Sequence, residues 1–142
     1  MEILVCYDYE DPDGKLLDIA KLQARAFNAF VHIVSSHPGS YREEVKKREA
    51  DKLWEEVEKI EKGLESAKAI FDEAGIACAT HVSMRGLNPG EDLVLYAREN
   101  RLDFIFISIQ KKSRMDKLIF GSTAQYVLLH AHCPVVSVPV AS

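Results

Sequence analysis

Two kinds of hydrophobic pattern alternate along the chain of 142 residues. The first is a short run of consecutive apolar residues, which is typical of a strand buried on both faces of a parallel sheet. The second repeats apolar residues every three or four positions, as in a helix that buries one stripe. These patterns predict strands at 3–7, 29–34, 76–84, 104–109 and 135–138, and helices over 16–27, over 42–74, and from residues 88 and 122 onward.

The resulting order is β-α-β-α-β-α-β-α-β with short connections. Such alternation predicts right-handed crossovers and a doubly wound, five-stranded parallel sheet with helices on both faces. The strand at 76–84 alternates apolar and polar residues, which indicates an edge position, whereas the strand at 104–109 is apolar up to Ser108 and is expected to be central. Because no linker, repeat or low-complexity stretch interrupts the pattern, we expect one α/β domain over residues 1–142.

Local signals refine the ends of these elements. Asn88 followed by Pro89 and Glu91 predicts a helix start, with Asn88 as N-cap and Glu91 reaching back to it. The sequence from Ser122 to Gln125 has the capping-box form S-x-x-Q and predicts the start of the last helix. The polar and basic stretch 110–117 is expected to be a loop.

Composition excludes several classes of protein. The net charge is −4 and the sequence pI is about 5.7, which gives no general attraction to nucleic acid. No apolar run approaches the roughly 20 residues of a membrane helix, and no secretory signal is evident at the N-terminus. The cysteines, Cys6, Cys78 and Cys133, are odd in number and widely spaced, so neither a disulfide framework nor a zinc site is expected. We therefore expect a cytoplasmic protein without a membrane partner.

Candidate chemistry lies where a ligand would bind in such a fold, at the carboxyl ends of the strands where strand order reverses. If the first and fourth strands are neighbours, Asp8 lies opposite Ser108. The segment Gly121–Thr123, at a helix N-terminus, faces the same region. Free backbone N–H groups and the helix dipole favour an anion there, typically a phosphate.

Three stretches of the chain also carry a family resemblance. Residues 3–8, ILVCYD, end in an aspartate, and residues 102–108, LDFIFIS, contain an aspartate, Asp103, directly before the apolar run. The most specific stretch is 121–136, in which Gly-Ser opens a helix and Cys-Pro-Val leads into the last strand. On these features the chain resembles the universal stress protein family over nearly its whole length. The resemblance implies a sheet of strand order 3-2-1-4-5, of the adenine nucleotide alpha hydrolase-like type.

Nucleotide-binding members of that family share a loop of the form G-x-x-G-x9-G-[ST]. On this chain its last glycine and hydroxyl residue are Gly121 and Ser122, whereas the first two glycine positions hold Ser108 and Lys111. The resemblance implies an adenine near Asp8 and Val34, and ATP with Mg²⁺ as the ligand. The predicted nucleotide-binding residues are therefore Asp8, Val34, Ser108, Lys111, Gly121, Ser122 and Thr123.

Two alternatives stay open. Side chains at 108 and 111 hinder close approach of a phosphate to the backbone, which favours a dimeric protein-interaction module without a nucleotide. A slow nucleotide hydrolase could use the same crevice, but no spacing pairs a nucleophile with a base, so no catalytic residue is predicted. His130 and His132 lie two apart, which on a helix does not place both on one face, so no metal site is predicted either.

The last predicted strand would leave an apolar edge exposed in a monomer. Exposed edges invite pairing with another chain, and Pro139 limits how far such pairing extends. Relatives of this fold commonly dimerise through the last strand. We therefore expect a homodimer through this edge, involving Val135, Val136 and Val138.

Overall fold

The computed structural model describes residues 1–8, 11, 13–40, 47–112 and 117–141; at 47, 48, 111, 112, 117–119 and 141 it describes the backbone alone. Five parallel strands form the sheet in the order β3-β2-β1-β4-β6. This confirms the predicted order, with β6 as the expected fifth strand. The strands are β1 (Glu2–Cys6), β2 (Phe30–Ser36), β3 (Cys78–Ser83), β4 (Phe104–Lys112) and β6 (Val135–Ala141).

A short additional strand, β5 (Lys117–Ile119), pairs antiparallel with Gln110–Lys112. The expectation of a loop over 110–117 is therefore wrong for Gln110–Lys112, which extend β4, and for Lys117. Residues 113–116 lie outside the described residues. The pattern did not predict this pairing because Gln110–Lys112 and Lys117 are polar, and the three residues of β5 are too few to show a hydrophobic period.

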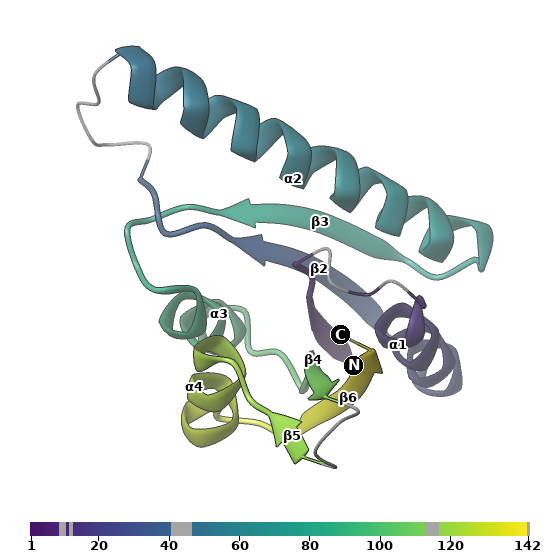
Figure 1. Ribbon diagram of the computed structural model, residues 1–142. Coiled ribbons are helices and arrows are strands. Elements are labelled where there is room, and N and C mark those ends of the chain that lie inside the picture. The colour runs from purple at the N-terminus through teal and green to yellow at the C-terminus, as the bar shows by residue number, and fades with distance from the viewer. Residues whose placement is uncertain (9–10, 12, 41–46, 113–116, 142) are drawn as a thin grey trace.

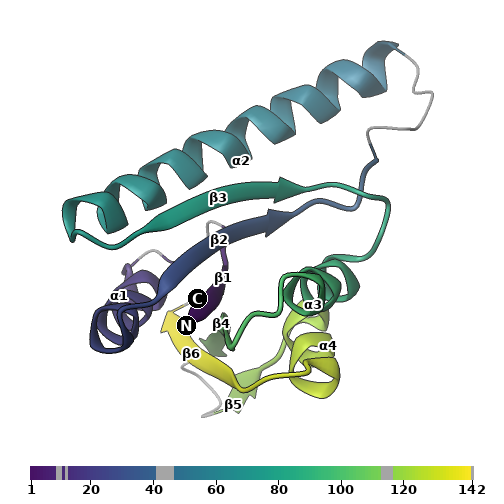
Figure 2. The same cartoon turned by 180° about the vertical axis from the view of Figure 1, so that it is seen from behind.

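Helices cover both faces of the sheet, as Figures 1 and 2 show. On one face α1 and α2 pack against residues such as Ile3 and Val5, and on the other α3 and α4 pack against Leu4. These three side chains of β1 are fully buried, and each contributes roughly 1.5–3 kcal/mol by burial. The helices are α1 (Lys15–Phe27), α2 (Lys47–Glu73), α3 (Pro89–Glu99) and α4 (Ser122–His130).

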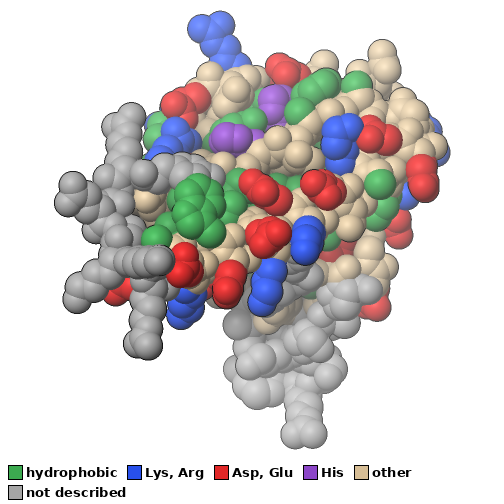
Figure 3. All heavy atoms as spheres, turned by 90° about the horizontal axis from the view of Figure 1, so that it is seen from above, with side chains coloured by type: hydrophobic (Ala, Val, Ile, Leu, Met, Phe, Trp, Pro, Cys, Tyr) green, Lys and Arg blue, Asp and Glu red, His purple; other side chains and the backbone are tan. Residues whose placement is uncertain are grey.

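The helix α2 lies over β2 and β3 and turns a charged face outward. Seen from above, the surface that α2 covers carries interspersed acidic and basic side chains (Figure 3). Its inward stripe, by contrast, contains the buried residues Val57, Leu64, Ala67 and Phe71. This division is that of a helix laid on a sheet. Among the described residues, no helix combines the length and apolar character needed to cross a membrane.

The starts of two helices differ from the prediction in detail. Asn88 is the N-cap of α3, with Pro89 first in the helix, but its side chain makes no capping hydrogen bond. The N-cap of α4 is Gly121, not Ser122, and it has no side-chain cap either. Since Gly121 is extended (φ −64°, ψ 163°), the helix starts at Ser122, where a side chain cannot reach back as in a capping box.

Candidate functional site

A cavity of about 420 Å³ opens at the carboxyl ends of β1, β2 and β4. The ends of the sheet form its floor, and residues of α2, α3 and the start of α4 contribute to its walls. It therefore lies at the predicted crevice between the first and fourth strands. The lining residues are Cys6, Tyr7, Asp8, Val34, Ser35, Ser36, Ile60, Pro89, Leu93, Ile107, Ser108, Gln110, Gly121, Ser122, Thr123 and Ala124.

The structure brings nearly all of the predicted site residues together in this cavity. Asp8, Val34, Ser108 and the segment Gly121–Thr123 all line it. The remaining one, Lys111, has its backbone in β4, between Leu118 of β5 and Ala141 of β6, and its side chain is outside the described residues. The predicted positions thus converge, and their role in binding a nucleotide stays a prediction.

The cavity has an apolar end and a polar end. Val34 of β2 and Leu93 of α3 are buried and line the apolar end, together with Cys6 and Ile107 of the central strands. The polar end is the N-terminus of α4. Nothing lies within 4 Å of a Cβ placed on Gly121, so the approach to the first backbone N–H groups of the helix is open. The N-cap, Gly121, has no side chain to accept from these groups, so they can donate to an anion.

The two positions that depart from the family's glycines lie in a paired strand. Ser108 is half-buried in β4 opposite Val138 of β6, and Lys111 is flanked by strands on both sides. An open glycine loop offers several backbone N–H groups to a phosphate, whereas strand backbone bonds mainly to its neighbours. Anion donors in this cavity are therefore expected chiefly from α4.

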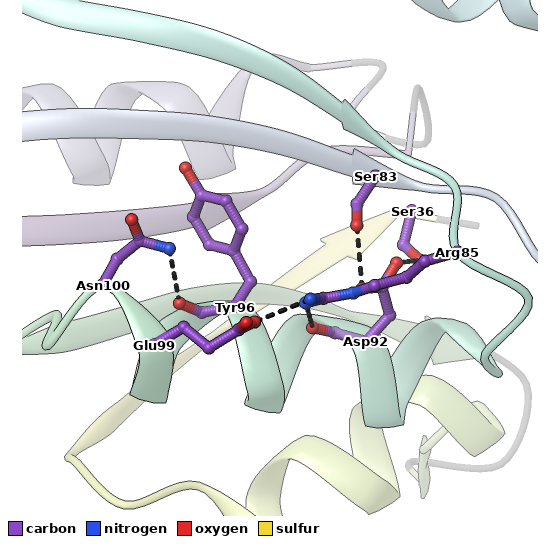
Figure 4. A network of polar contacts seen from close by, with 7 residues as sticks. All are labelled: Ser36, Ser83, Arg85, Asp92, Tyr96, Glu99 and Asn100. Atoms are coloured by element: carbon purple, nitrogen blue, oxygen red, sulfur yellow. Dashed lines mark hydrogen bonds and ion pairs between the residues drawn. The ribbon is translucent and has the colours of Figure 1, made fainter. Parts of the chain in front are cut away.

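An ionic network centred on a buried aspartate borders the cavity at the ends of β2 and β3, and it extends outward to exposed Arg85 and Glu99 (Figure 4). Asp92 of α3 is 0% exposed. Its Oδ1 accepts from the Ser83 hydroxyl at 2.8 Å and from Arg85 Nε at 2.5 Å, and its Oδ2 accepts from the Ser36 hydroxyl at 2.5 Å. Arg85 also donates to Glu99 at 2.7 Å. Since Ser36 lines the cavity, this network shapes the wall of the site.

Sequence reasoning missed this network. Acidic residues are common in the first turn of a helix, because they complement the helix dipole. Asp92 fits that pattern, so its sequence position gave no sign of a further role. The electrostatics follow the geometry. Burial would lower the pKa of Arg85, but its bonds to Asp92 and Glu99 outweigh burial and raise that pKa.

Burial raises the pKa of the Cys6 thiol, and Asp8 and Cys133 raise it further. The thiol is therefore neutral and does not act as a nucleophile at neutral pH.

Within the described part of the chain, no group of three or more His, Cys, Asp or Glu side chains is placed to hold a metal ion. His132 instead bonds to the backbone oxygen of Leu102 at 3.1 Å, and His130 packs on the Tyr126 ring.

Comparisons with known proteins agree with the fold. The sequence model of the universal stress protein family matches residues 1–139. A universal stress protein structure from Archaeoglobus fulgidus has 33% sequence identity and a TM-score of 0.80, covering 96% of this chain and 97% of that one. A structure of the universal stress protein from Archaeoglobus fulgidus in complex with dAMP has 29% identity and a TM-score of 0.75, with 96% of both chains covered.

A curated relative, a universal stress protein of Methanocaldococcus jannaschii, is 27% identical over 94 residues. That match covers 63% of this chain and 54% of the relative, so the match spans about half the relative's length.

Proposed function

Because the chain belongs to the universal stress protein family, we propose that it binds an adenine nucleotide in the cavity at the carboxyl end of its sheet. The observation that carries the proposal is the open, uncapped N-terminus of α4 at Gly121, facing a cavity whose other end is apolar. The structure of the universal stress protein from Archaeoglobus fulgidus in complex with dAMP supports a ligand of this class.

The shape of the cavity suggests how such a ligand would lie. A phosphate suits the N–H groups of Gly121–Thr123, where the helix dipole stabilises negative charge. The planar base suits the apolar end between Val34 and Leu93. ATP with Mg²⁺ is included in the proposal. Asp8 at the rim is the one carboxylate among the described lining residues, and a single carboxylate with substrate phosphates is a common setting for Mg²⁺.

A second candidate is a dimeric protein-interaction module without a nucleotide. It is favoured by Ser108 and Lys111, which stand at the family's glycine positions and lie in a paired strand. Both candidates describe a stress-response protein that works by binding. Their proposed setting is the cytoplasm, and Cys6, Cys78 and Cys133, none of which forms a disulfide, suit a reducing compartment.

The homodimer through β6 is part of the proposal. Ile105 N–H donates to Pro134 O at 3.0 Å, and a parallel ladder alternates, so the backbone groups of Val135, Ser137 and Pro139 face the outer edge. Val138 is only 6% exposed and belongs to the protomer core. The proposed contact therefore uses the outer backbone edge, and the half-buried Val135 and Val136 rather than the Val138 side chain.

A thermal-shift titration tests the nucleotide. The pure protein is heated with AMP, or with ATP and Mg²⁺, and with GTP as the control. A ligand that binds the folded state raises the melting temperature as its concentration exceeds the dissociation constant. A saturable rise with an adenine nucleotide supports the proposal. No rise at millimolar concentration, with the protein folded, overturns it and leaves the interaction module.

A further inference from the structure

The C-terminal end of β2 carries two serines whose hydroxyl protons are already committed. The Ser36 hydroxyl lies 2.5 Å from Asp92 Oδ2, and the Ser35 hydroxyl bonds to the backbone oxygen of Tyr7. A carboxylate and a carbonyl only accept hydrogen bonds, so each serine must be the donor. Both serines line the cavity. Toward a ligand, the two hydroxyl oxygens can therefore act only as hydrogen-bond acceptors.

The partner of Ser36 cannot turn to change this polarity. Asp92 is fully buried, and its other oxygen is held by Ser83 and by Arg85 Nε. Arg85 is itself anchored by Glu99 and by the backbone oxygen of Asp92 (Figure 4). The carboxylate thus has a fixed orientation, and one of its oxygens always faces the Ser36 hydroxyl.

The position of Ser36 relates this polarity to a ligand. Ser36 follows Val34 on the same face of β2, the face covered by α3, because residues two apart in a strand point the same way. Val34 lines the apolar end of the cavity. For a base held there, Ser36 is the next side chain on that face toward the carboxyl end of β2, and it offers an acceptor. A 6-aminopurine presents an N–H donor to that acceptor, whereas a 6-oxopurine presents a carbonyl oxygen, which would face another lone pair.

We propose that Ser36 is a specificity-determining residue that accepts a hydrogen bond from the amino group of a 6-aminopurine, and that Asp92 is the positioning residue that sets its polarity. The inference rests on the proposed nucleotide site and names the feature of that site that selects the base. It gives Asp92 a function distinct from stability, because the carboxylate decides whether Ser36 donates or accepts.

The first test compares AMP with IMP, which differ at position 6 of the purine, by isothermal titration calorimetry. Wild-type protein is expected to bind AMP at least about tenfold more tightly. The variant Ser36→Ala should lose most of that preference, since a single hydrogen bond is worth about three- to tenfold in affinity. Ser66→Ala is the matched control, because Ser66 is exposed on α2, is not among the residues that line the cavity, and donates its hydroxyl to the backbone oxygen of Lys62.

The second variant, Asp92→Asn, should change Ser36 from a hydrogen-bond acceptor into a donor toward the ligand. In Asp92→Asn, the amide oxygen must stay toward Ser83 and Arg85, which both donate, so the amide nitrogen faces Ser36 and donates to it. The Ser36 proton is then released toward the cavity. For Asp92→Asn, the ratio of AMP affinity to IMP affinity is expected to be lower than for Ser36→Ala, because a donating Ser36 favours the carbonyl oxygen of IMP. A residue that only supported the wall would lower both affinities together.

The outcomes separate the two levels of the proposal. If wild-type protein binds neither nucleotide, the nucleotide site itself is wrong and this inference falls with it. If it binds AMP but Ser36→Ala keeps the wild-type ratio of AMP to IMP affinity, the inference is wrong and the nucleotide site stands. Because each ratio is measured on one folded sample, checked by circular dichroism, a loss of stability in either variant does not affect it.

Discussion

Gly90 of α3 and Tyr126 of α4 pack so closely that a Cβ on Gly90 would lie 2.7 Å from the Tyr126 Cβ. Since that atom belongs to the stem of the tyrosine, no rotation of the ring relieves the contact. We expect Gly90→Ala to lower the free energy of unfolding by about 1–3 kcal/mol, measured by urea denaturation. Gly121→Ala is the control for the added methyl group, because its new Cβ would meet nothing within 4 Å and its expected cost is only that of a poorer N-cap, up to about 1 kcal/mol. Equal stability of the two variants would refute the close contact.

Gly121→Val tests the phosphate end of the cavity. The backbone at Gly121 has φ −64° and open space around it, so valine fits, at a cost of about 1 kcal/mol as a poorer N-cap. Its branched side chain would cover the first N–H groups of α4. We expect AMP affinity, measured by calorimetry, to fall about tenfold or more. Unchanged affinity would mean that the phosphate does not bind at this helix.

Ser108→Gly asks whether the departure from the family's glycine limits binding. Removing the side chain widens the cavity beside β4, so affinity for AMP and ATP should rise several-fold, while stability falls by about 0.5–1 kcal/mol. The matched control is Ser137→Gly, an exposed serine in the neighbouring strand β6 that is not among the lining residues. If only the stability changes, the serine at 108 is no obstacle to the ligand.

Ser137→Pro tests the dimer. The Ser137 N–H faces the outer edge of β6, so proline removes a donor available to a partner and none used within the protomer. The wild-type mass in solution is expected to be that of a dimer, and the variant that of a folded monomer, by light scattering after gel filtration. Ser137→Ala keeps the N–H and should stay dimeric. A monomeric wild type, or a dimeric proline variant, would exclude pairing through this edge.

Cys6 makes stability depend on alkaline pH. Burial raises its pKa above the ordinary value of 9.0, so the folded state keeps the proton after the unfolded state has lost it. The unfolded state therefore binds fewer protons above pH 9, and the contribution that is complete below pH 9 is lost as pH rises. We expect the free energy of unfolding to fall by about 1 kcal/mol from Cys6 between pH 9 and 10. In urea titrations, the free energy of unfolding of Cys6→Ala should fall less over that interval than that of the wild type. An equal fall in both proteins would show that Cys6 is not the group responsible.

Much of the fold could be predicted because its strands are short apolar runs and its helices have clear stripes. β4 was expected to be central, and Ile105 and Phe106 are fully buried between β1 and β6. The strand β5 was not predicted because it has only three residues and pairs with the polar end of β4, and so short a segment shows no hydrophobic period.

The candidate site was predictable where a rule of topology applied. Asp8, Ser108 and Gly121 meet because the carboxyl ends of parallel strands share one edge of the sheet. Asp92 could not be found in the same way. Asp92 lies in α3, and its hydrogen-bond partners Ser36 and Ser83 come from the ends of β2 and β3. Its burial arises only when α3 packs against the sheet.

The pairing of β1 with β4 also governs the order in which the protein can fold as it is synthesised. Glu2 N–H donates to the Asp103 carboxylate and Asp103 N–H donates to Glu2 O, across 101 positions of sequence. The β1–β2 pair, which aligns Glu2 with Phe30, closes a far shorter loop. On the ribosome, β1, α1 and β2 can therefore assemble while β4 is still untranslated. The cavity is completed only when β4 and α4 emerge, so the ligand site is among the last parts of the molecule to exist.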